Sequence, residues 1–330
     1  MPTGKRMIMS RTPLRVSFLG GGTDIKEYYS AHGGAVVSAA INKYIHIIVN
    51  KKFDNKIRVS YSRTEIVSTP DELAHPLVRE ALKLLDITKA VEILSISDIP
   101  SEGTGLGSSS SFTVGLLNAL HAWQGEHAPS NQLAQEACRI EREIVKDPGG
   151  KQDQYIAAFG GLRLFEFLPD EQVSVNYVLM GDGGRKVLDD SLMLLYTGQT
   201  RSSSDILRTQ IGGMQDKLDY YTAIKDMAYS CFRALERSDI EETGRLLDEG
   251  WQFKKRLSHG ITNKTIDDLY NRAKNAGAYG GKITGAGGGG FLLLLVDPDK
   301  KEDVRKELNH LVEQDIKVET YGSRIVYVGE

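Results

Sequence analysis

The stretch from Gly103 to Ser111 constrains this chain more than any other, because three glycines at alternate positions run directly into four serines. An apolar segment with a helical pattern follows, from Phe112 to Trp123. Glycine lets a backbone turn sharply and approach a ligand closely. A glycine turn before a helix directs free N–H groups and the positive end of the helix dipole at one point, which suits a phosphate. The stretch therefore predicts either an anion-binding loop or a flexible turn before a buried helix.

The spacing of these glycines excludes two common nucleotide-binding motifs. They occupy positions 103, 105 and 107, which is not the G-x-G-x-x-G spacing of a dinucleotide-binding fold. No lysine follows them, as the Walker A loop requires. The choice between a phosphate loop and a simple turn therefore depends on the rest of the chain.

Composition excludes several classes of protein. The length of 330 residues favours about two domains, and the net charge of −3 gives no general positive field for nucleic acid. The sequence contains no run of about 18 apolar residues, so we expect no membrane span. Residues 1–9 lack the apolar core of a signal peptide. Cys138 and Cys231 match no metal spacing and favour reduced, packed thiols. We expect a cytoplasmic protein with neither a nucleic-acid nor a membrane partner.

Two further glycine clusters lie near the two ends of the chain. Residues 20–22 are a glycine triplet followed by Thr23 and Asp24, which is either a turn or a loop kept small for a ligand, with Asp24 binding hydroxyl groups. Near the other end, four adjacent glycines occupy positions 287–290 between two strand-like segments. Because such a run is entropically costly, it favours a backbone that passes very close to the loop at 103–108 or to a nucleotide in that loop.

The pattern between the clusters predicts a mixture of strands and helices. Residues 91–99 alternate like a strand directly before the glycine-serine stretch, which gives the order strand, loop, helix. Thr69 to Glu72 has the pattern of a capping box and predicts a helix start. Residues 202–276 predict three or four helices, and Pro298 predicts another helix that reaches about Gln314, followed by strands at 316–321 and 324–328.

Polar residues on or beside the predicted helices are the candidate catalytic and binding residues. Glu141 and Glu143 lie on a helix predicted from 130 to 145, where most glutamates are simply solvated. Asp153 lies at the start of the next helix, where an acid serves either as an ordinary cap or as a group presented to a cleft. A second turn rich in hydroxyl groups, at 197–204, contains Arg201.

Three of these segments together carry a family resemblance. Residues 15–24, 105–110 and 282–290 resemble, in this order, the three motifs of the GHMP small-molecule kinases, and the resemblance covers nearly the whole chain. Within the family, the glycine triplet at 20–22, the Gly-Gly-Lys-Gln-Asp-Gln-Tyr segment and the Thr-Gly-Gln-Thr-Arg turn are similar to the heptose 7-phosphate kinase branch. The fucokinase branch shares several of these features.

The resemblance implies an α+β fold of two domains. The N-terminal domain, residues 1–182, would resemble domain 2 of ribosomal protein S5, and the C-terminal domain, residues 183–330, would be ferredoxin-like. The glycine-rich segment at 181–184 is the best candidate for the boundary. The active site would lie between the two domains.

The resemblance also implies cofactors and residue roles. ATP and Mg²⁺ are the expected cofactors, with Ser109 and Glu141 matching the metal-binding residues. Asp153 matches the acid that accepts the proton of the attacking hydroxyl, and Arg15 matches the basic residue beside that acid. The expected ATP-binding residues are Gly103, Thr104, Gly105, Leu106, Gly107, Ser108, Ser109 and Ser110. The expected substrate-binding residues are Gly21, Gly22, Thr23, Asp24, Lys151, Gln152, Gly198 and Arg201, and the third motif supplies Gly285, Gly287, Gly288 and Gly289.

These roles predict an ATP-dependent sugar 1-kinase. Residues 21 and 22 lack the side chains with which galactokinases bind sugar, so galactose is not the expected substrate. The branch resemblance favours D-glycero-D-manno-heptose 7-phosphate, whose distal phosphate would need a cation such as Arg201, Lys151 or Lys26. Two alternatives stay open: a 1-kinase of L-fucose or another free hexose, and a sugar or nucleotide sensor without catalytic activity. The oligomeric state is open between monomer and homodimer.

Overall fold

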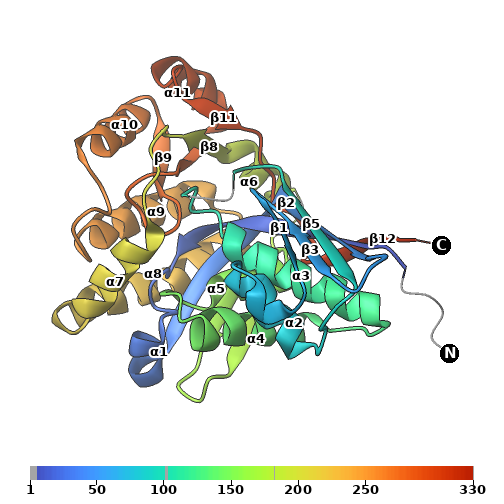
Figure 1. The fold of residues 1–330 in the computed structure, drawn as a ribbon. Helices are drawn as coiled ribbons and strands as arrows, with labels where there is room; N and C mark the ends of the chain where they lie inside the picture. Colours follow the sequence, from blue (N-terminus) through green and yellow to red (C-terminus); the bar gives the residue numbers. More distant parts are fainter. Residues whose placement is uncertain (1–5, 101–102, 182, 330) are drawn as a thin grey trace.

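The structure is a computed structural model that describes residues 6–100, 103–181 and 183–329. Two sheets and their covering helices make up these residues (Figure 1). The first sheet contains the strands β1 (Ile8–Leu19), β2 (Gly34–Lys51), β3 (Ile57–Ser60), β4 (Thr64–Val67), β5 (Val91–Ser97), β6 (Leu162–Phe167), β7 (Val173–Tyr177) and β12 (Arg324–Val328). Among the described residues its order is β12-β1-β2-β5-β3-β4, with β6 paired to β2 and β7 paired to β6.

Strand β2 joins the parts of this sheet, because it is long enough to pair with different strands along its length. Residues 34–39 pair with β6, and residues 45–51 pair with β5. Strand β1 pairs with β2 along most of its length, which places the glycine triplet after β1 at the same end of the sheet as the start of β2. The following turn therefore lies where the first sheet meets the rest of the molecule.

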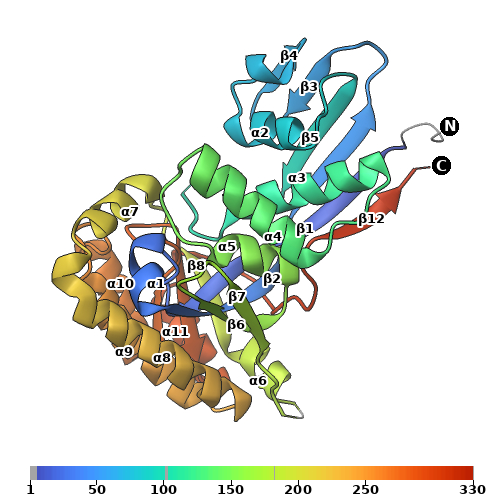
Figure 2. The same ribbon diagram turned by 90° about the horizontal axis from the view of Figure 1, so that it is seen from below.

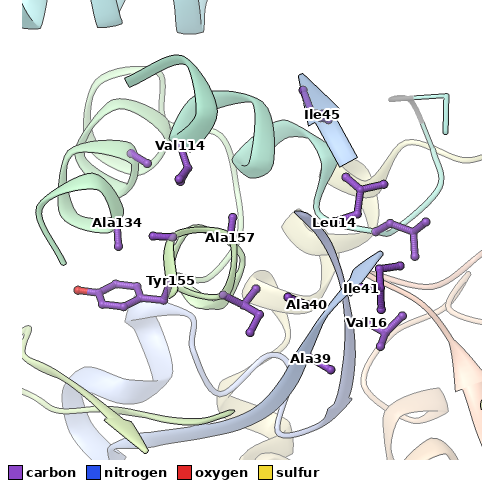
Figure 3. Packing of buried hydrophobic residues seen from close by; sticks show 14 of the residues in the cluster. Leu14, Val16, Ala39, Ala40, Ile41, Ile45, Val114, Ala134, Tyr155 and Ala157 are labelled. Carbon is purple, nitrogen blue, oxygen red and sulfur yellow. The ribbon is translucent and has the colours of Figure 1, made fainter. Parts of the chain in front are cut away.

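Six helices follow the strands of the first sheet in the described chain. They are α1 (Lys26–His32), α2 (Pro76–Leu84), α3 (Ser108–Gln124), α4 (Ser130–Cys138), α5 (Gln152–Phe159) and α6 (Gly184–Ser191). Helix α3 packs against β1 and β2, and a π-helical turn (Arg139–Ile144) continues α4. Figure 3 shows part of the core that these elements share: Ala134 of α4 lies near Tyr155 of α5, while residues of β1 and β2 such as Leu14 and Ile41 lie on the other side of α5.

The second sheet is antiparallel and smaller. Its strands are β8 (Leu192–Tyr196), β9 (Ala278–Ile283), β10 (Phe291–Val296) and β11 (Val312–Gln314), in the order β11-β8-β10-β9. Strand β10 is buried at every residue, as its continuous apolar sequence predicts. The surrounding helices are α7 (Ser203–Gly212), α8 (Leu218–Glu236), α9 (Ile240–Lys255), α10 (Lys264–Asn275) and α11 (Lys301–Glu307). Figure 2 shows α8 and α9 side by side, and these helices connect the halves because α8 packs on β2 and α9 on β9.

The end of the chain returns to the first sheet. Strand β12 pairs antiparallel with β1, so Val328 at the end of β12 lies beside Ile8 at the start of β1 (Figures 1 and 2). The sequence pattern places residues 183–330 in one C-terminal domain, and that boundary stays a prediction. The pairing shows that the last strand adds to the sheet of the N-terminal half.

Three local predictions from the sequence differ from the structure. Residues 316–321 do not form the predicted strand, and only Val318 among them makes an isolated bridge, to Ile41. The capping pattern at Thr69 starts only a 3-10 turn (Pro70–Glu72), and α2 begins later at Pro76. A residue before proline disfavours the helical conformation, and His75 accordingly has an extended ψ of 104°. The last predicted helix also starts as a 3-10 turn (Pro298–Lys300) and ends at Glu307, because β11 begins at Val312. The four helices α7 to α10 confirm the prediction for 202–276.

Candidate active site

The glycine-serine stretch forms a tight loop at the N-terminus of the buried helix α3. Gly103, Gly105 and Gly107 have φ angles of +68°, +71° and +74°, a conformation that favours glycine. Gly107 is the residue that precedes the first turn of α3. The amide groups of this first turn have no partner within the helix and, together with the helix dipole, favour an anion. Residues 103–110 line one side of a cavity of about 190 Å³.

The third glycine cluster packs directly against this loop. A Cβ atom on Gly285 would lie 2.7 Å from the Cα of Gly105, and one on Gly290 would lie 2.5 Å from the carbonyl oxygen of Thr104. The hydroxyl of Thr284 also donates to the Thr104 carbonyl at 2.9 Å. The close approach that the glycine run predicts is therefore made by Gly290, the last of the four, together with Gly285 just before the run. The other three glycines of the run, Gly287, Gly288 and Gly289, instead lie against the backbone of Ile261, Gly260 and Gln199.

Arg15 and Asp153 form a bidentate ion pair at the centre of the cavity. The Arg15 Nε donates to Oδ1 at 2.7 Å and its Nη2 donates to Oδ2 at 2.6 Å. Arg15 comes from β1 and Asp153 from the first turn of α5, so the pair joins elements far apart in sequence. The Arg15 backbone N–H donates to the Leu106 carbonyl at 3.0 Å, and its Nη1 donates to the Gly105 carbonyl. The acid is thereby held beside the loop at 103–110.

Asp24 is the buried acid at another side of the cavity. It accepts hydrogen bonds from the Gly22 amide at 2.9 Å, from the Gln152 amide at 3.1 Å and from the Gln152 side chain at 3.3 Å. Burial raises the pKa of the Asp24 carboxyl, and the two backbone amides oppose this rise. Gly21 and Gly22 line the cavity beside it. Thr23, which the sequence places in the substrate site, is fully buried and donates its hydroxyl to the Gly20 carbonyl.

Glu141 is a further buried acid of the cavity, next to the glycine-serine loop. Its Oε2 accepts hydrogen bonds from the Ser110 hydroxyl at 2.9 Å and the Gln154 side chain at 2.8 Å. Its Oε1 is buried and has no hydrogen-bond partner among the described residues. Burial raises the pKa of this carboxyl, and Arg142 opposes the rise. Ser109 lines the cavity from an exposed position next to Ser110.

Glu143 differs from Glu141 in position. It is exposed and does not line the cavity. The π-helical turn at 139–144 therefore turns only one of the two candidate glutamates inward. Among the residues that the structure describes, no group of three or more His, Cys, Asp or Glu side chains could hold a metal ion by itself.

Several residues that the sequence assigns to the substrate site lie outside the cavity lining. The Lys151 ammonium pairs with Glu171 and lies 4.8 Å from the centre of the Tyr29 ring. Lys26 pairs with the same Glu171 at 2.8 Å. Gly198 and Arg201 do not line the cavity either, and the Arg201 side chain lies beside Gly288 and Gly260. The following serines, Ser203 and Ser204, do line it.

The structure also places residues in the cavity that sequence reasoning missed. Ser17 lines it with a buried hydroxyl that has no partner among the described residues. Lys282 donates to the Phe18 carbonyl at 3.0 Å, and Lys254 donates to the Gly285 carbonyl. The sequence pattern does indicate that Lys254 is buried, because it continues the apolar face of α9 that contains Leu247, Gly250 and Trp251. A lysine at such a position is unusual unless its ammonium has a buried partner.

A glycine-rich loop at a helix N-terminus, beside an acid–arginine pair, is the arrangement expected of a small-molecule phosphotransferase site. Comparison with known proteins agrees: the model of the GHMP kinases N terminal domain matches residues 74–161, and that of the GHMP kinases C terminal matches residues 231–314. The D-glycero-alpha-D-manno-heptose 7-phosphate kinase of Campylobacter jejuni is 34% identical over 319 residues, which are 92% of this chain and 93% of that protein. The chain belongs to the GHMP kinase family.

Two further relatives are similar over nearly the whole chain. A D-glycero-D-manno-heptose 1-phosphate kinase from Bacteroides thetaiotaomicron has a crystal structure that matches with a TM-score of 0.81 and 27% identity, covering 98% of this chain and 100% of that one. The L-fucokinase/L-fucose-1-P guanylyltransferase of Bacteroides fragilis is 26% identical over 92% of this chain and 36% of that longer protein.

These findings confirm the predicted family and the predicted α+β fold class. The protein is an ATP-dependent sugar kinase. In the part of the chain that the structure describes, no helix is long and apolar enough to cross a membrane.

Proposed function

We propose that the protein transfers the γ-phosphoryl group of ATP to the anomeric hydroxyl of D-glycero-D-manno-heptose 7-phosphate, forming the 1,7-bisphosphate. The observation that carries this proposal is the Arg15–Asp153 pair, held at 2.6–2.7 Å beside the phosphate loop and open to the same cavity as Asp24. Such an arrangement needs an acceptor hydroxyl between the acid and the donor phosphate. The 34% identity to the heptose 7-phosphate kinase supports the choice of acceptor.

Each side of the cavity has a separate task in this proposal. The amides of the loop at 103–110 bind the phosphates of ATP at the N-terminus of α3. Asp153 orients the acceptor hydroxyl and receives its proton, and Arg15 fixes the carboxylate in place through two parallel hydrogen bonds. Asp24 binds further sugar hydroxyls. Catalysis of phosphoryl transfer depends mainly on this positioning and on neutralising charge.

The residues on the donor side fit a magnesium ion. The buried Oε1 of Glu141 has no partner among the described residues, and a cation would satisfy it and favour the ionised carboxylate. Ser109 and Glu141 would hold the ion together with phosphate oxygens of ATP, which are ligands that Mg²⁺ prefers. When bound there, Mg²⁺ would neutralise negative charge on the phosphates.

The acceptor side has room for a large sugar. Gly21 and Gly22 present backbone instead of side chains, and the Ser17 hydroxyl supplies an additional polar contact. For the distal phosphate we propose Arg201 together with the serines at 203 and 204. Arg201 does not itself line the cavity, but it directly precedes the serines that do, and it makes no ion pair with any residue that the structure describes, so its guanidinium is available for a phosphate.

A free hexose such as L-fucose is the second candidate acceptor, and one observation favours it. Lys26 and Lys151, two of the cations that the sequence offers for a distal phosphate, are both paired with Glu171 outside the cavity lining. Together these pairs and Tyr29 lower the pKa of the Glu171 carboxyl to about 2, so it stays ionised and retains both lysines. A sugar without a second phosphate would need neither of them.

The experiment that tests the proposal measures ADP release with a panel of acceptors. The panel contains D-glycero-D-manno-heptose 7-phosphate, L-fucose, mannose, galactose and mannose 6-phosphate. We expect the highest kcat/KM with the heptose 7-phosphate. Preference for L-fucose would establish the second candidate, and nucleotide binding without ADP release on any acceptor would indicate the sensor that lacks catalytic activity.

A further inference from the structure

Lys254 is a buried cation that the mechanism above does not use. It lies near the end of α9 with 8% of its surface exposed, and its side chain lines the catalytic cavity. The next residue, Lys255, is on the other face of the helix and pairs with Asp267 at 3.5 Å. Burial of an ammonium group is costly unless a partner compensates its charge. The position of Lys254 therefore requires a compensating group.

The protein itself supplies little of this compensation. The Lys254 ammonium donates one hydrogen bond, to the Gly285 carbonyl. Among the described residues, no carboxylate lies within 4.0 Å of it. An ammonium has three donor hydrogens, so this bond leaves capacity for a ligand in the cavity. A neutral carbonyl cannot balance a full charge.

The charged groups around Lys254 do not neutralise its ammonium. Arg15 on β1 and Lys282 on β9 are the basic groups that face it, and burial lowers the pKa of Lys282 well below its usual value. Of the two carboxylates, Asp153 is already engaged by Arg15, and Asp24 accepts three hydrogen bonds from Gly22 and Gln152. Burial lowers the pKa of Lys254 to about 8, Arg15 adds to this, and the two carboxylates oppose it. Both nearby carboxylates thus have other partners, and neither is free to pair with Lys254.

The contacts of Lys254 place it where the phosphoryl group must pass. Its partner, Gly285, lies against Gly105 of the phosphate loop. The Gly105 carbonyl in turn accepts a hydrogen bond from Arg15, which holds the acid Asp153. Lys254 is therefore connected to the loop through Gly285, and from that loop to the acid through Gly105 and Arg15. Its surplus of donors and charge faces the space between them.

We propose that the Lys254 ammonium binds the phosphoryl group as it moves from ATP to the sugar, which makes Lys254 a further catalytic residue. In this step the acceptor oxygen forms a bond to the γ-phosphorus, and the bond from that phosphorus to the bridging oxygen breaks. The bonding electron pair leaves with ADP, and the acceptor proton goes to the Asp153 carboxylate. Lys254 keeps its own proton and neutralises charge on the transferred oxygens. The inference rests on the kinase activity and not on which sugar is the acceptor.

The variant Lys254→Gln separates charge from structure. Its amide keeps an N–H donor for the Gly285 carbonyl but carries no charge. We expect kcat to fall about 10²- to 10³-fold, as when one stabilising donor is lost from other transition states, while the affinity for ATP and the melting temperature stay near those of the wild type. Lys254→Arg restores part of the activity, and the matched control Lys255→Gln behaves like the wild type. A kcat of Lys254→Gln equal to that of the wild type overturns the proposal.

The kinetic constants distinguish the transferred phosphoryl group from the acceptor's own phosphate. Each variant is measured with whichever acceptors of the panel the wild type phosphorylates, so the result does not depend on the heptose assignment. A loss in kcat on every acceptor supports the proposal. A rise only in KM, and only for acceptors that already carry a phosphate, contradicts it.

A pH profile provides a second readout that a purely structural role would not move. The ammonium form is needed, so kcat/KM of the wild type should fall as pH rises through about 8, the pKa that burial gives this group. Lys254→Gln should lack this decline. A decline of the same size and position in Lys254→Gln contradicts the proposal.

Discussion

The contact between the third glycine cluster and the phosphate loop allows a quantitative test. Gly290 has a φ of +86°, and a Cβ added there would lie 2.5 Å from the Thr104 carbonyl oxygen. Its own amide donates to the Gln199 carbonyl at 2.7 Å, and its carbonyl accepts from the Thr197 amide at 2.9 Å. These bonds prevent the backbone from moving away without loss. In Gly290→Ala the phosphate loop must therefore move instead.

The chain offers a matched control for this substitution. Gly125 has the same φ of +86°, but a Cβ added there would meet no atom within 4 Å. A left-handed conformation costs a non-glycine residue about 1–2 kcal/mol, and forcing an extra carbon into a packed site costs about 1–3 kcal/mol. Gly125→Ala should show only the first cost. Gly290→Ala should show both, about 2–5 kcal/mol in all.

Urea denaturation and ATP titration together measure this effect. We expect Gly290→Ala to reduce the free energy of unfolding by about 1–3 kcal/mol more than Gly125→Ala does. We also expect only Gly290→Ala to weaken ATP binding, because it alone displaces Thr104. Equal destabilisation by both variants, with unchanged affinity for ATP, would refute the reasoning.

Two further predictions concern the histidine of α3 and the proposed metal site. His121 contacts Glu136 at 2.8 Å and Glu126 at 3.1 Å, and these carboxylates, Glu136 first, raise its pKa. The protonated His121 therefore stabilises the folded protein fully below the ordinary histidine pKa of about 6.5, and this stabilisation is lost as pH rises through the raised pKa. The free energy of unfolding of the wild type should decline over that pH range. The same curve should be flatter in His121→Gln. Glu141→Gln should raise the Mg²⁺ concentration needed for half-maximal activity about tenfold or more. The exposed Glu143→Gln is its control, and an equal effect of the two variants would contradict the metal assignment.

The motifs were predictable from sequence because each depends on backbone geometry that only certain residues allow. The alternating glycines at 103–107 all have positive φ angles, and the serines that follow begin α3 directly. The cost of the four adjacent glycines at 287–290 likewise predicted a close contact with the loop at 103–108, and of these four Gly290 makes it. Such local backbone constraints can be predicted from the residue types alone.

Long-range packing was harder to predict. Nothing local in residues 324–328 indicates that they pair with β1 at the opposite end of the chain. The predicted role of Lys151 in phosphate binding did not include Glu171, which lies on a turn 20 residues later and pairs with it. Lys254 was overlooked because a lysine late in a helix is usually a solvated residue near the negative end of the helix dipole. Its burial depends on the third glycine cluster, which lies in a different element.

The ³¹P NMR spectrum of the product tests whether Asp153 directs the phosphoryl group to the anomeric hydroxyl. The protein is incubated with ATP, Mg²⁺ and D-glycero-D-manno-heptose 7-phosphate, in parallel with Asp153→Asn. With the wild type we expect a second sugar-phosphate resonance, coupled to the anomeric proton. With Asp153→Asn, which should still bind ATP, we expect no such resonance. A phosphate on a different hydroxyl, or turnover that survives in Asp153→Asn, would show that the proposed mechanism is wrong.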